Sequence, residues 1–324
     1  MGMASLRFQR VLARGFVLLL ALGLVSDIVA GVATAHTQDA GRDPVTTLKV
    51  DVKLVNVFVS VTDGRGAPVA SLGKGNFRVF EDNKEQKISV FDRQSEAPLS
   101  IVLAVDTSLS TRKDLKLELE SARRFAHAIL RPQDAMSFYQ FNEIVTELVR
   151  FTPDPKRVDQ AIDRVRGGAA TALYDALLLG SQTLETRQGR KVFVVITDGG
   201  DTVSQTSYAA ALRAAQQAEA IVYSIVIVPI QASAGRDTGG EHALIQISND
   251  TGGKYYYSSS VPQMDAAFKQ ISDELRTQYL LAYYPSQRYS DSEFRRIEVR
   301  LDGSSASKYQ ARHRTGYYTV RDQF

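Results

Sequence analysis

The sequence predicts an α/β fold with a doubly wound, mostly parallel sheet, and a flanking β-sandwich formed from the N- and C-terminal segments. Between Leu99 and about Leu275, apolar strand-like runs alternate with segments of helical periodicity. This alternation is typical of a parallel sheet that helices cover on both faces. The regions before and after it, 46–97 and 277–324, contain only short strand-like segments, each too small to bury a core alone. We therefore expect the two terminal segments to pack together.

The N-terminus, residues 1–35, predicts a secretory signal peptide. Three arginines precede the apolar run GFVLLLALGLV, and the small residues of VATA follow it. An uncleaved membrane anchor is the alternative, but Asp27 would then lie inside the span at a cost of about 3 kcal/mol. We expect cleavage after Ala35, a secreted or periplasmic protein, and no stable membrane span in the mature chain. Residues 36–45 read as a polar linker.

Composition excludes several classes of protein. The net charge of the chain is +3, and the three arginines and one aspartate of the signal segment contribute +2, which leaves +1 for the rest. So small a charge gives no electrostatic case for binding nucleic acid. The absence of cysteine excludes disulfides, thiol catalysis and zinc–thiolate sites, and the four histidines show no ligand-like spacing.

Residues 46–97 are expected to be all β. The stretch LKVDVKLVNVFVSVTD alternates apolar and polar residues, GRGAP reads as a turn, and NFRVFEDNKEQKISVFD reads as a hairpin with its corner at Asp82–Asn83. Residues 277–324 return to this pattern in QYLLAYYP, RRIEVRLDG and YQARHRTGYY.

Residues 98–276 are expected to form the α/β domain. A buried strand, IVLAV, leads into a helix whose apolar face includes Leu115, Phe125 and Ile129. The later segments follow in order: strands AMSFYQF and IVTELVRF, helices DPKRVDQAIDRV and TALYDALLLGSQTLET, strand KVFVVITDGG, helix SYAAALRAAQQAEA, strand IVYSIVIV, helix EHALIQISNDTGG, strand KYYYS and helix VPQMDAAFKQISDELR.

Acidic residues end two of these strands. Asp106 ends IVLAV and Asp198 ends VFVVIT. In an open α/β sheet, ligands bind beyond the carboxyl ends of the strands, so neighbouring strands would bring both carboxylates to one edge. Ser108, Ser110 and Thr171 would add neutral oxygens beside them. Oxygen ligands with few charges suit a hard cation, with Mg²⁺ the first expectation and Mn²⁺ or Ca²⁺ as alternatives.

Two other interpretations compete with a metal site. The hydroxyls of Ser108 and Ser110 could cap a helix beginning near Thr111, Thr171 could cap the next helix, and Asp198 could belong to a Gly-rich turn. Asp-Thr-Ser also occurs in aspartic proteases, but their chemistry requires two related β halves sharing a proton between carboxylates. Helices follow both acidic strands here and no second such motif exists, so we discount the protease.

At these residues a family resemblance becomes specific. DTSLS resembles the Asp-x-Ser-x-Ser element of von Willebrand factor A and integrin I domains, GGAATALYDAL resembles their Thr-bearing loop, and VVITDGGDT resembles their third, Asp-bearing loop. The flanking segments GNFRVFEDNKEQKISVF and RTGYY are similar to a narrower VWFA-related group common in acidobacteria. The resemblance implies a Rossmann-like fold and a metal-ion-dependent adhesion site. In such a site Ser108, Ser110 and Thr171 offer hydroxyls, and Asp106 and Asp198 act directly or through water.

The resemblance has one departure: Ala169–Ala170 stand as extra residues between the glycine pair and Thr171. Asp201 is a possible outer acid outside the primary set. Together these features predict an exported, non-enzymatic adhesion module that captures an acidic group of a protein partner through the cation. A structural scaffold with a stabilising metal site is the alternative. A hydrolase is disfavoured because no histidine or cysteine lies near either acid in the sequence.

Overall fold

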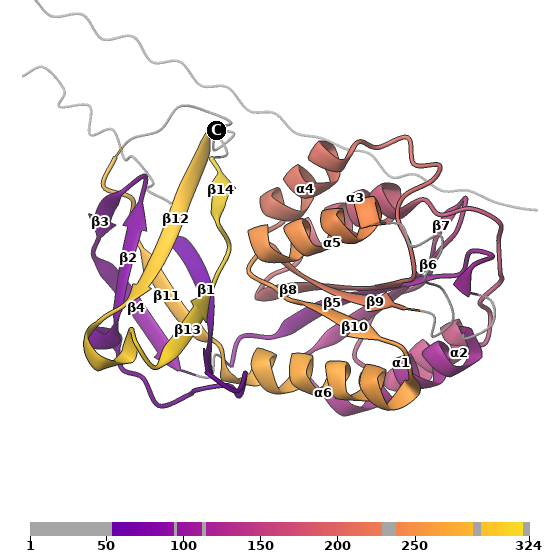
Figure 1. Cartoon of the computed structure of the whole chain (residues 1–324), viewed down its shortest axis with the longest axis horizontal. Coiled ribbons are helices and arrows are strands. Elements are labelled where there is room, and N and C mark those ends of the chain that lie inside the picture. The colour runs from indigo at the N-terminus through magenta and orange to yellow at the C-terminus, as the bar shows by residue number, and fades with distance from the viewer. Residues whose placement is uncertain (1–53, 94–95, 112–114, 229–237, 288–292, 320–324) are drawn as a thin grey trace, which may run out of the picture. The chain divides into compact units, whose positions relative to one another are not determined.

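The computed structural model describes residues 54–93, 96–111, 115–228, 238–287 and 293–319, all of which fall within one compact unit, Asp51–Phe324 (Figure 1). The predicted signal peptide, the linker and residues 46–53 of the predicted N-terminal β segment lie outside the described residues. Among the residues described, no helix is both long and apolar enough to cross a membrane.

The elements follow the predicted order of β, then α/β, then β. The strands are β1 (Val55–Asp63), β2 (Phe77–Glu81), β3 (Lys84–Gln86), β4 (Ile88–Arg93), β5 (Leu99–Asp106), β6 (Ala135–Phe141), β7 (Val145–Thr152), β8 (Arg190–Thr197), β9 (Ala220–Ile227), β10 (Tyr255–Ser258), β11 (Tyr279–Tyr283), β12 (Phe294–Leu301), β13 (Tyr309–Arg312) and β14 (Gly316–Tyr318). The helices are α1 (Leu115–Ile129), α2 (Pro155–Ile162), α3 (Leu173–Glu185), α4 (Tyr208–Gln217), α5 (Thr238–Asp250) and α6 (Val261–Thr277).

The α/β half contains a six-stranded sheet in the order β10-β9-β8-β5-β6-β7. All neighbouring pairs are parallel except β6 and β7, which are antiparallel. Helices α1, α2 and α6 cover one face, and α3, α4 and α5 cover the other (Figure 1). The predicted doubly wound, mostly parallel sheet is therefore confirmed.

Burial on both faces explains the composition of the central strand. Every residue of β5 is buried, because helices pack above and below it. On one face, α1 buries Ala122, Phe125 and Ile129, and the ring of Phe125 stacks on Phe268 of α6 at 4.4 Å. The apolar face expected for this helix is thus the one that contacts the core, with Leu115 only partly buried.

The second half is a β-sandwich of two four-stranded sheets, β13-β1-β11-β4 and β14-β12-β2-β3 (Figure 1). Each sheet contains strands from both terminal segments, as the sequence predicted. The Asp82–Asn83 corner is confirmed: these residues have φ angles of 44° and 66°, as a two-residue hairpin turn between β2 and β3 requires. However, β4 does not continue this hairpin. It crosses to the other sheet and pairs with β11, which places the side chain of Ile88 in the sandwich core.

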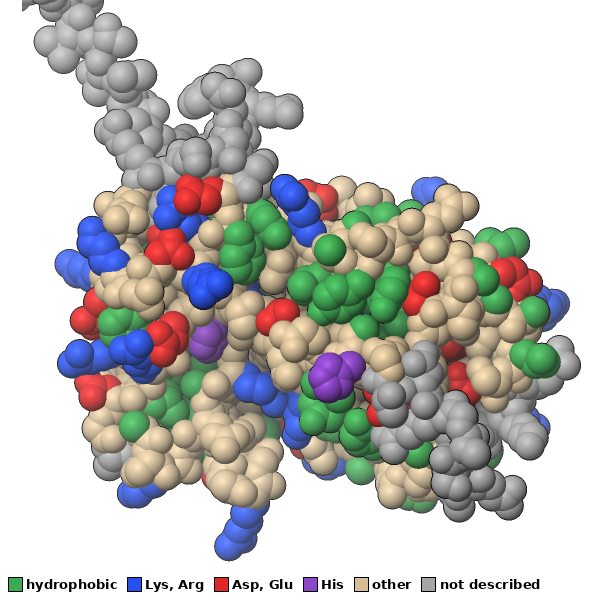
Figure 2. Space-filling view, turned by 45° about the horizontal axis from the view of Figure 1, so that its top comes forward, with side chains coloured by type: hydrophobic (Ala, Val, Ile, Leu, Met, Phe, Trp, Pro, Cys, Tyr) green, Lys and Arg blue, Asp and Glu red, His purple; other side chains and the backbone are tan. Residues whose placement is uncertain are grey.

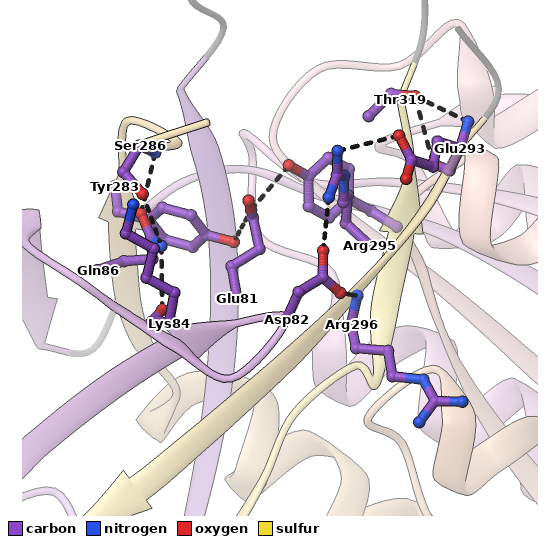
Figure 3. Close-up of polar contacts among 11 residues, drawn as sticks. Glu81, Asp82, Lys84, Gln86, Tyr283, Ser286, Glu293, Arg295, Arg296 and Thr319 are labelled. Carbon is purple, nitrogen blue, oxygen red and sulfur yellow. Dashed lines mark hydrogen bonds and ion pairs between the residues drawn. The ribbon is translucent and has the colours of Figure 1, made fainter. Parts of the chain in front are cut away.

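The interior of the sandwich also holds an acid, Glu81. The hydroxyls of Tyr283 and Tyr317 donate to its Oε2 atom at 2.7 and 2.9 Å, and Figure 3 shows Tyr283 pointing toward it. Burial raises the pKa of Glu81 above its ordinary value. Beside it, Asp82 accepts hydrogen bonds from the Arg295 guanidinium at 2.7 Å and from the Arg296 amide at 3.0 Å (Figure 3). These contacts are part of the sandwich's own packing.

The two halves meet at a set of polar residues, all buried except the partly exposed Arg312, that we call the seam cluster: Ser60, Tyr223, Glu274, Gln278 and Arg312. Glu274 of α6 accepts hydrogen bonds from Ser60 of β1 at 2.9 Å and Tyr223 of β9 at 2.6 Å, and forms an ion pair with Arg312 of β13. The seam cluster therefore connects the end of α6 to the six-stranded sheet, through β9, and to one sheet of the sandwich, through β1 and β13.

The two halves also differ at the surface. On the face drawn in Figure 2, acidic and basic side chains are interspersed over the sandwich, whereas hydrophobic side chains gather over the helices of the α/β half.

Candidate metal site

The topology brings the two predicted acids to one edge of the sheet. β5 and β8 are parallel neighbours, with Val105 opposite Ile196. Asp106 is the last residue of β5, and Asp198 follows directly after β8. Because both strands run in the same direction, their carboxyl ends and the acids on them lie at the same edge.

Hydroxyl groups join the two acids into one network. The Ser108 amide donates to Asp106 Oδ1 at 2.9 Å, and the Ser108 and Ser110 hydroxyls lie 3.1 Å apart. The Ser110 hydroxyl in turn donates to Asp198 Oδ1 at 2.9 Å. The structure therefore places four of the five predicted ligands in one continuous set of contacts.

The fifth predicted ligand, Thr171, lies on an adjacent loop. Its backbone is fixed by Thr202, whose hydroxyl accepts from the Thr171 amide at 2.8 Å and whose own amide donates to the Thr171 carbonyl at 2.8 Å. The N-cap of α3 is Ala172 and has no side-chain cap, so Thr171 does not cap that helix. Within the described part of the chain, the Thr171 hydroxyl makes no hydrogen bond to the other four predicted ligands.

The electrostatics of the two acids are unusual. Burial, with a smaller contribution from the charge of Asp198, raises the pKa of Asp106 to about 6. Burial also raises the pKa of Asp198. Among the described residues neither acid forms an ion pair with a lysine, arginine or histidine. The two carboxylates thus lie at one site without an ion pair to any basic side chain that the structure describes.

This donor set fits a hard divalent cation. Two carboxylates would neutralise such an ion, and the serine hydroxyls would supply further oxygens without added repulsion. The described residues contain no group of three or more His, Cys, Asp or Glu side chains that could hold a metal. A soft-metal site or an all-carboxylate site is therefore not what these residues form, and any cation held here would depend on hydroxyl ligands.

Sequence reasoning missed two supporting residues. Thr197, the last residue of β8, donates its hydroxyl to Asp106 Oδ2 at 2.6 Å. The Asn142 side chain donates to the Thr107 hydroxyl at 3.0 Å, and its backbone carbonyl accepts from the Ala172 amide at 2.7 Å. Thr197 could have been noticed as a polar residue ending an apolar strand, but nothing in the sequence marks the contacts of Asn142.

The extra residues Ala169–Ala170 have a local explanation. Their amides donate to Glu143 Oε2 at 2.7 and 3.3 Å, and these backbone hydrogen bonds lower the pKa of Glu143. A Cβ atom on Gly168 would lie 2.4 Å from both Asn142 Cγ and Glu143 Oε2. The loop before Thr171 is thus packed tightly against the loop that follows β6.

Comparisons with known proteins complete this description. No curated protein matches the sequence. Among solved structures, a von Willebrand factor type A protein from Catenulispora acidiphila is 10% identical and aligns over 82% of this chain and 74% of its own, with a TM-score of 0.49. An aerotolerance-related membrane protein from Bacteroides fragilis NCTC 9343 is 20% identical over 55% of this chain and 98% of its own, with a TM-score of 0.42.

A third structure is the vWF domain of the type V pili tip protein Mfa5 from Porphyromonas gingivalis, which is 13% identical over 54% of this chain and 94% of its own (TM-score 0.43). Similarities at this level do not indicate what the chain binds. The family profile of the von Willebrand factor type A domain, in contrast, matches residues 100–274, which is more than half of the chain. The chain belongs to the von Willebrand factor type A domain family.

Proposed function

We propose that this chain is an exported, non-enzymatic binding module that captures an acidic group of a protein partner through a divalent cation. Asp106, Ser108, Ser110 and Asp198 would hold the cation, and the Thr171 hydroxyl would join them. Mg²⁺ is the expected ion, with Mn²⁺ and Ca²⁺ as alternatives. The proposal of export rests on the signal segment, residues 1–35.

One observation carries the proposal. Asp106 and Asp198 lie at the ends of two neighbouring strands, and Ser108 and Ser110 connect them by hydrogen bonds. Among the described residues, no cationic side chain forms an ion pair with either acid. Buried carboxylates are normally paired with a positive charge or bound to a metal, because an isolated buried charge is costly. Since no described residue supplies that charge, this arrangement supports the proposal that a cation binds here.

The chain's residues have distinct parts in this function. Asp106 is held by Thr197 and by the Ser108 amide, so its carboxylate is oriented before any ligand arrives. Ser110 and Asp198 lie nearer to solvent than Asp106, which is fully buried. A bound cation supplies an open coordination position for a carboxylate oxygen of the partner. Within the described part of the chain, no histidine or lysine contacts the Ser108 or Ser110 hydroxyl to activate it as a nucleophile, which favours binding over catalysis.

Isothermal titration of the purified chain with Mg²⁺ and with Mn²⁺ tests the proposal. We expect one binding event per chain, lost in Asp106→Ala and in Asp198→Ala. Glu81→Gln is the matched control, because Glu81 is another buried acid with a raised pKa, and it lies in the sandwich and not at the ends of β5 and β8. Wild-type protein that binds neither ion, or an Asp106→Ala variant that binds as well as wild type, would overturn the proposal.

A metal-dependent pull-down from the producing cell's envelope and medium separates a binding module from a scaffold. We expect the partner to be retained with Mg²⁺, and lost with a chelator and in the double variant Ser108→Ala, Ser110→Ala. If the site served only to stabilise a scaffold, Asp198→Ala would lower the melting temperature while every partner stayed bound.

A further inference from the structure

A cleft of about 680 Å³ lies between the outer face of one sandwich sheet and the helices α4 and α5. Residues of β2, β12 and β14 line one side of it, and Leu212 and Gln216 of α4 and Asp250 of α5 line the other. Its volume is within the range of ligand pockets, about 300–1,000 Å³, and such pockets often form where two parts of a protein meet. The cleft is therefore a candidate ligand site.

Contacts between the two halves fix the walls of this cleft. The Thr315 amide donates to the Asp250 carbonyl at 2.9 Å, and the Arg213 guanidinium lies over the Tyr318 ring at 4.5 Å. Helix α4 ends just before β9 begins at Ala220. The cleft thus lies near the amino ends of the parallel strands, at the edge of the sheet opposite to the candidate metal site. A ligand bound here does not need the cation.

Two polar side chains that line the cleft have no partner among the described residues. Gln216 is only 6% exposed, yet its side-chain amide makes no hydrogen bond within the described part of the chain. The Arg296 guanidinium likewise forms no ion pair there, and it extends away from Asp82 (Figure 3). Buried amides normally have hydrogen-bond partners, because burial without one is costly. Both groups are therefore available to a ligand.

The charges that line the cleft indicate a neutral ligand. Two of the acids in the lining, Asp82 and Glu298, form ion pairs with arginines of β12 at 2.7 and 2.6 Å. The other charged residues of the lining are Asp250 and Arg296, whose charges are opposite. An anion or a cation would meet one favourable and one unfavourable charge, whereas a neutral polar molecule can hydrogen-bond to both.

Aromatic rings lie beside the polar groups on the sandwich side of the cleft. Phe294 of β12 is opposite Tyr318 of β14, with ring centroids 5.0 Å apart, and Glu298 of β12 is opposite Phe80 of β2. Alternate residues of a strand share one face, so Arg296 lies between these two pairs. Sugars combine apolar C–H faces, which pack against aromatic rings, with hydroxyls that bond to amide, carboxylate and guanidinium groups.

We infer that this cleft binds a neutral oligosaccharide. Phe294 and Tyr318 contact the faces of the sugar rings. The side chains of Gln216, Asp250 and Arg296 form hydrogen bonds with the sugar hydroxyls. An extended peptide fits the cleft less well, because strand addition requires an unpaired strand edge, and β12 is already paired with β2 on one side and β14 on the other.

A printed array tests this inference on the purified chain in the presence of a chelator. The array carries neutral oligomers of hexoses, pentoses and N-acetylhexosamines, together with hexuronate oligomers and neutral peptides. We expect at least one neutral oligosaccharide to be retained, and isothermal titration to give it a dissociation constant in the millimolar range or below. Binding in chelator separates this site from the candidate metal site.

Two substitutions locate the sugar in the cleft. Gln216→Leu keeps the approximate size of the side chain but removes its amide, and Arg296→Ala removes an exposed guanidinium. We expect each to weaken sugar binding about fivefold, as the loss of one hydrogen bond does. Gln216→Leu should not lower the melting temperature, because the amide it removes has no partner among the described residues. Gln217→Leu is the matched control, since Gln217 is exposed, neighbours Gln216 on α4 and is not part of the lining.

The remaining outcomes would overturn the inference. Retention of the hexuronate oligomers or the peptides alone would show that the ligand is not a neutral sugar, and so would a chain that retains no neutral oligosaccharide at millimolar concentration. If a sugar binds equally to wild type and to both variants, its site is not this cleft. None of these results changes the expected titration with Mg²⁺, so the proposed function stands or fails separately.

Discussion

Two buried carboxylates in this chain, Asp106 and Glu274, have opposite surroundings. Glu274 of the seam cluster forms an ion pair with Arg312 and accepts hydrogen bonds from Tyr223 and Ser60. Among the described residues, Asp106 accepts only from neutral groups, and the like charge of Asp198 lies beside it. At the seam cluster, Arg312 balances the charge of Glu274. No described residue supplies a positive charge to Asp106 or Asp198 in the same way.

This difference indicates which acid has a structural role. A carboxylate that is paired and hydrogen-bonded inside the protein fixes the contact between two elements, here α6 and the sandwich. A pair of carboxylates held by hydroxyls, with no basic side chain beside it in the described part of the chain, is suited to binding an external cation. The four predictions that follow test this comparison.

The largest effect on stability is expected when Mg²⁺ is added to the wild-type protein. Mg²⁺ at 100 times its dissociation constant should raise the free energy of unfolding of wild type by about 2.7 kcal/mol. Asp198→Asn keeps the acceptor for Ser110 but removes a carboxylate, so it should show no such gain and should be at least as stable as wild type in chelator. Denaturant titrations with and without Mg²⁺ measure both values. An equal Mg²⁺ gain in the variant would contradict the assignment.

The seam cluster should respond in the opposite sense. Arg312→Ala leaves Glu274 buried without its cation, which we expect to cost about 2 kcal/mol of stability with or without Mg²⁺. Arg78→Ala is the control, because its ion pair with Asp302 is about half exposed on both sides and should add little. Urea unfolding of both variants gives the comparison. If the two substitutions cost the same, the seam cluster does not stabilise the chain.

The packing of Gly168 against the loop that follows β6 is expected to have an intermediate effect on stability. In Gly168→Ala the new Cβ would overlap Asn142 and Glu143, so we expect a loss of about 1.5 kcal/mol together with weaker Mn²⁺ binding. Gly199→Ala, next to Asp198, is the matched control because a Cβ there meets nothing within 4 Å. Thermal unfolding and metal titration of both variants check this. Equal behaviour would mean that the Gly168 loop yields without cost.

The smallest effect concerns pH. Burial lowers the pKa of His313, whose neutral ring accepts from the Val299 amide at 3.0 Å through Nε2 and donates to the Arg314 carbonyl at 2.7 Å through Nδ1. The unfolded chain therefore binds a proton at a higher pH than the folded chain, and stability falls as pH drops below about 6.5 toward the folded-state pKa.

In His313→Gln this part of the pH dependence should disappear, while His127→Gln, which changes a half-exposed histidine paired with Asp159, should keep it. Urea midpoints measured between pH 8 and pH 5 decide the point. A wild type whose decline with acid is identical to that of His313→Gln would show that the His313 ring does not contribute to the pH dependence.

Patterns confined to short stretches predicted much of this structure. The covered sheet followed from apolar runs such as IVLAV, and the β2–β3 corner followed from Asp82–Asn83. The crossing of β4 to the other sheet was not predictable in this way, because its partner strand, β11, comes from the opposite end of the chain. The same is true of Glu143, which contacts residues 26 and 27 positions later.

By itself, the sequence determined the alternation of strands and helices, the polar residues that end two buried strands, and the resemblance in three loops that led to the family. These properties are local, because periodicity and strand-end chemistry lie within a few residues of each other. Only the tertiary structure decided that Glu274 has an internal cation while, among the described residues, Asp106 and Asp198 have none. The charge around a buried acid is set by side chains from distant strands, and only their packing fixes which of them meet.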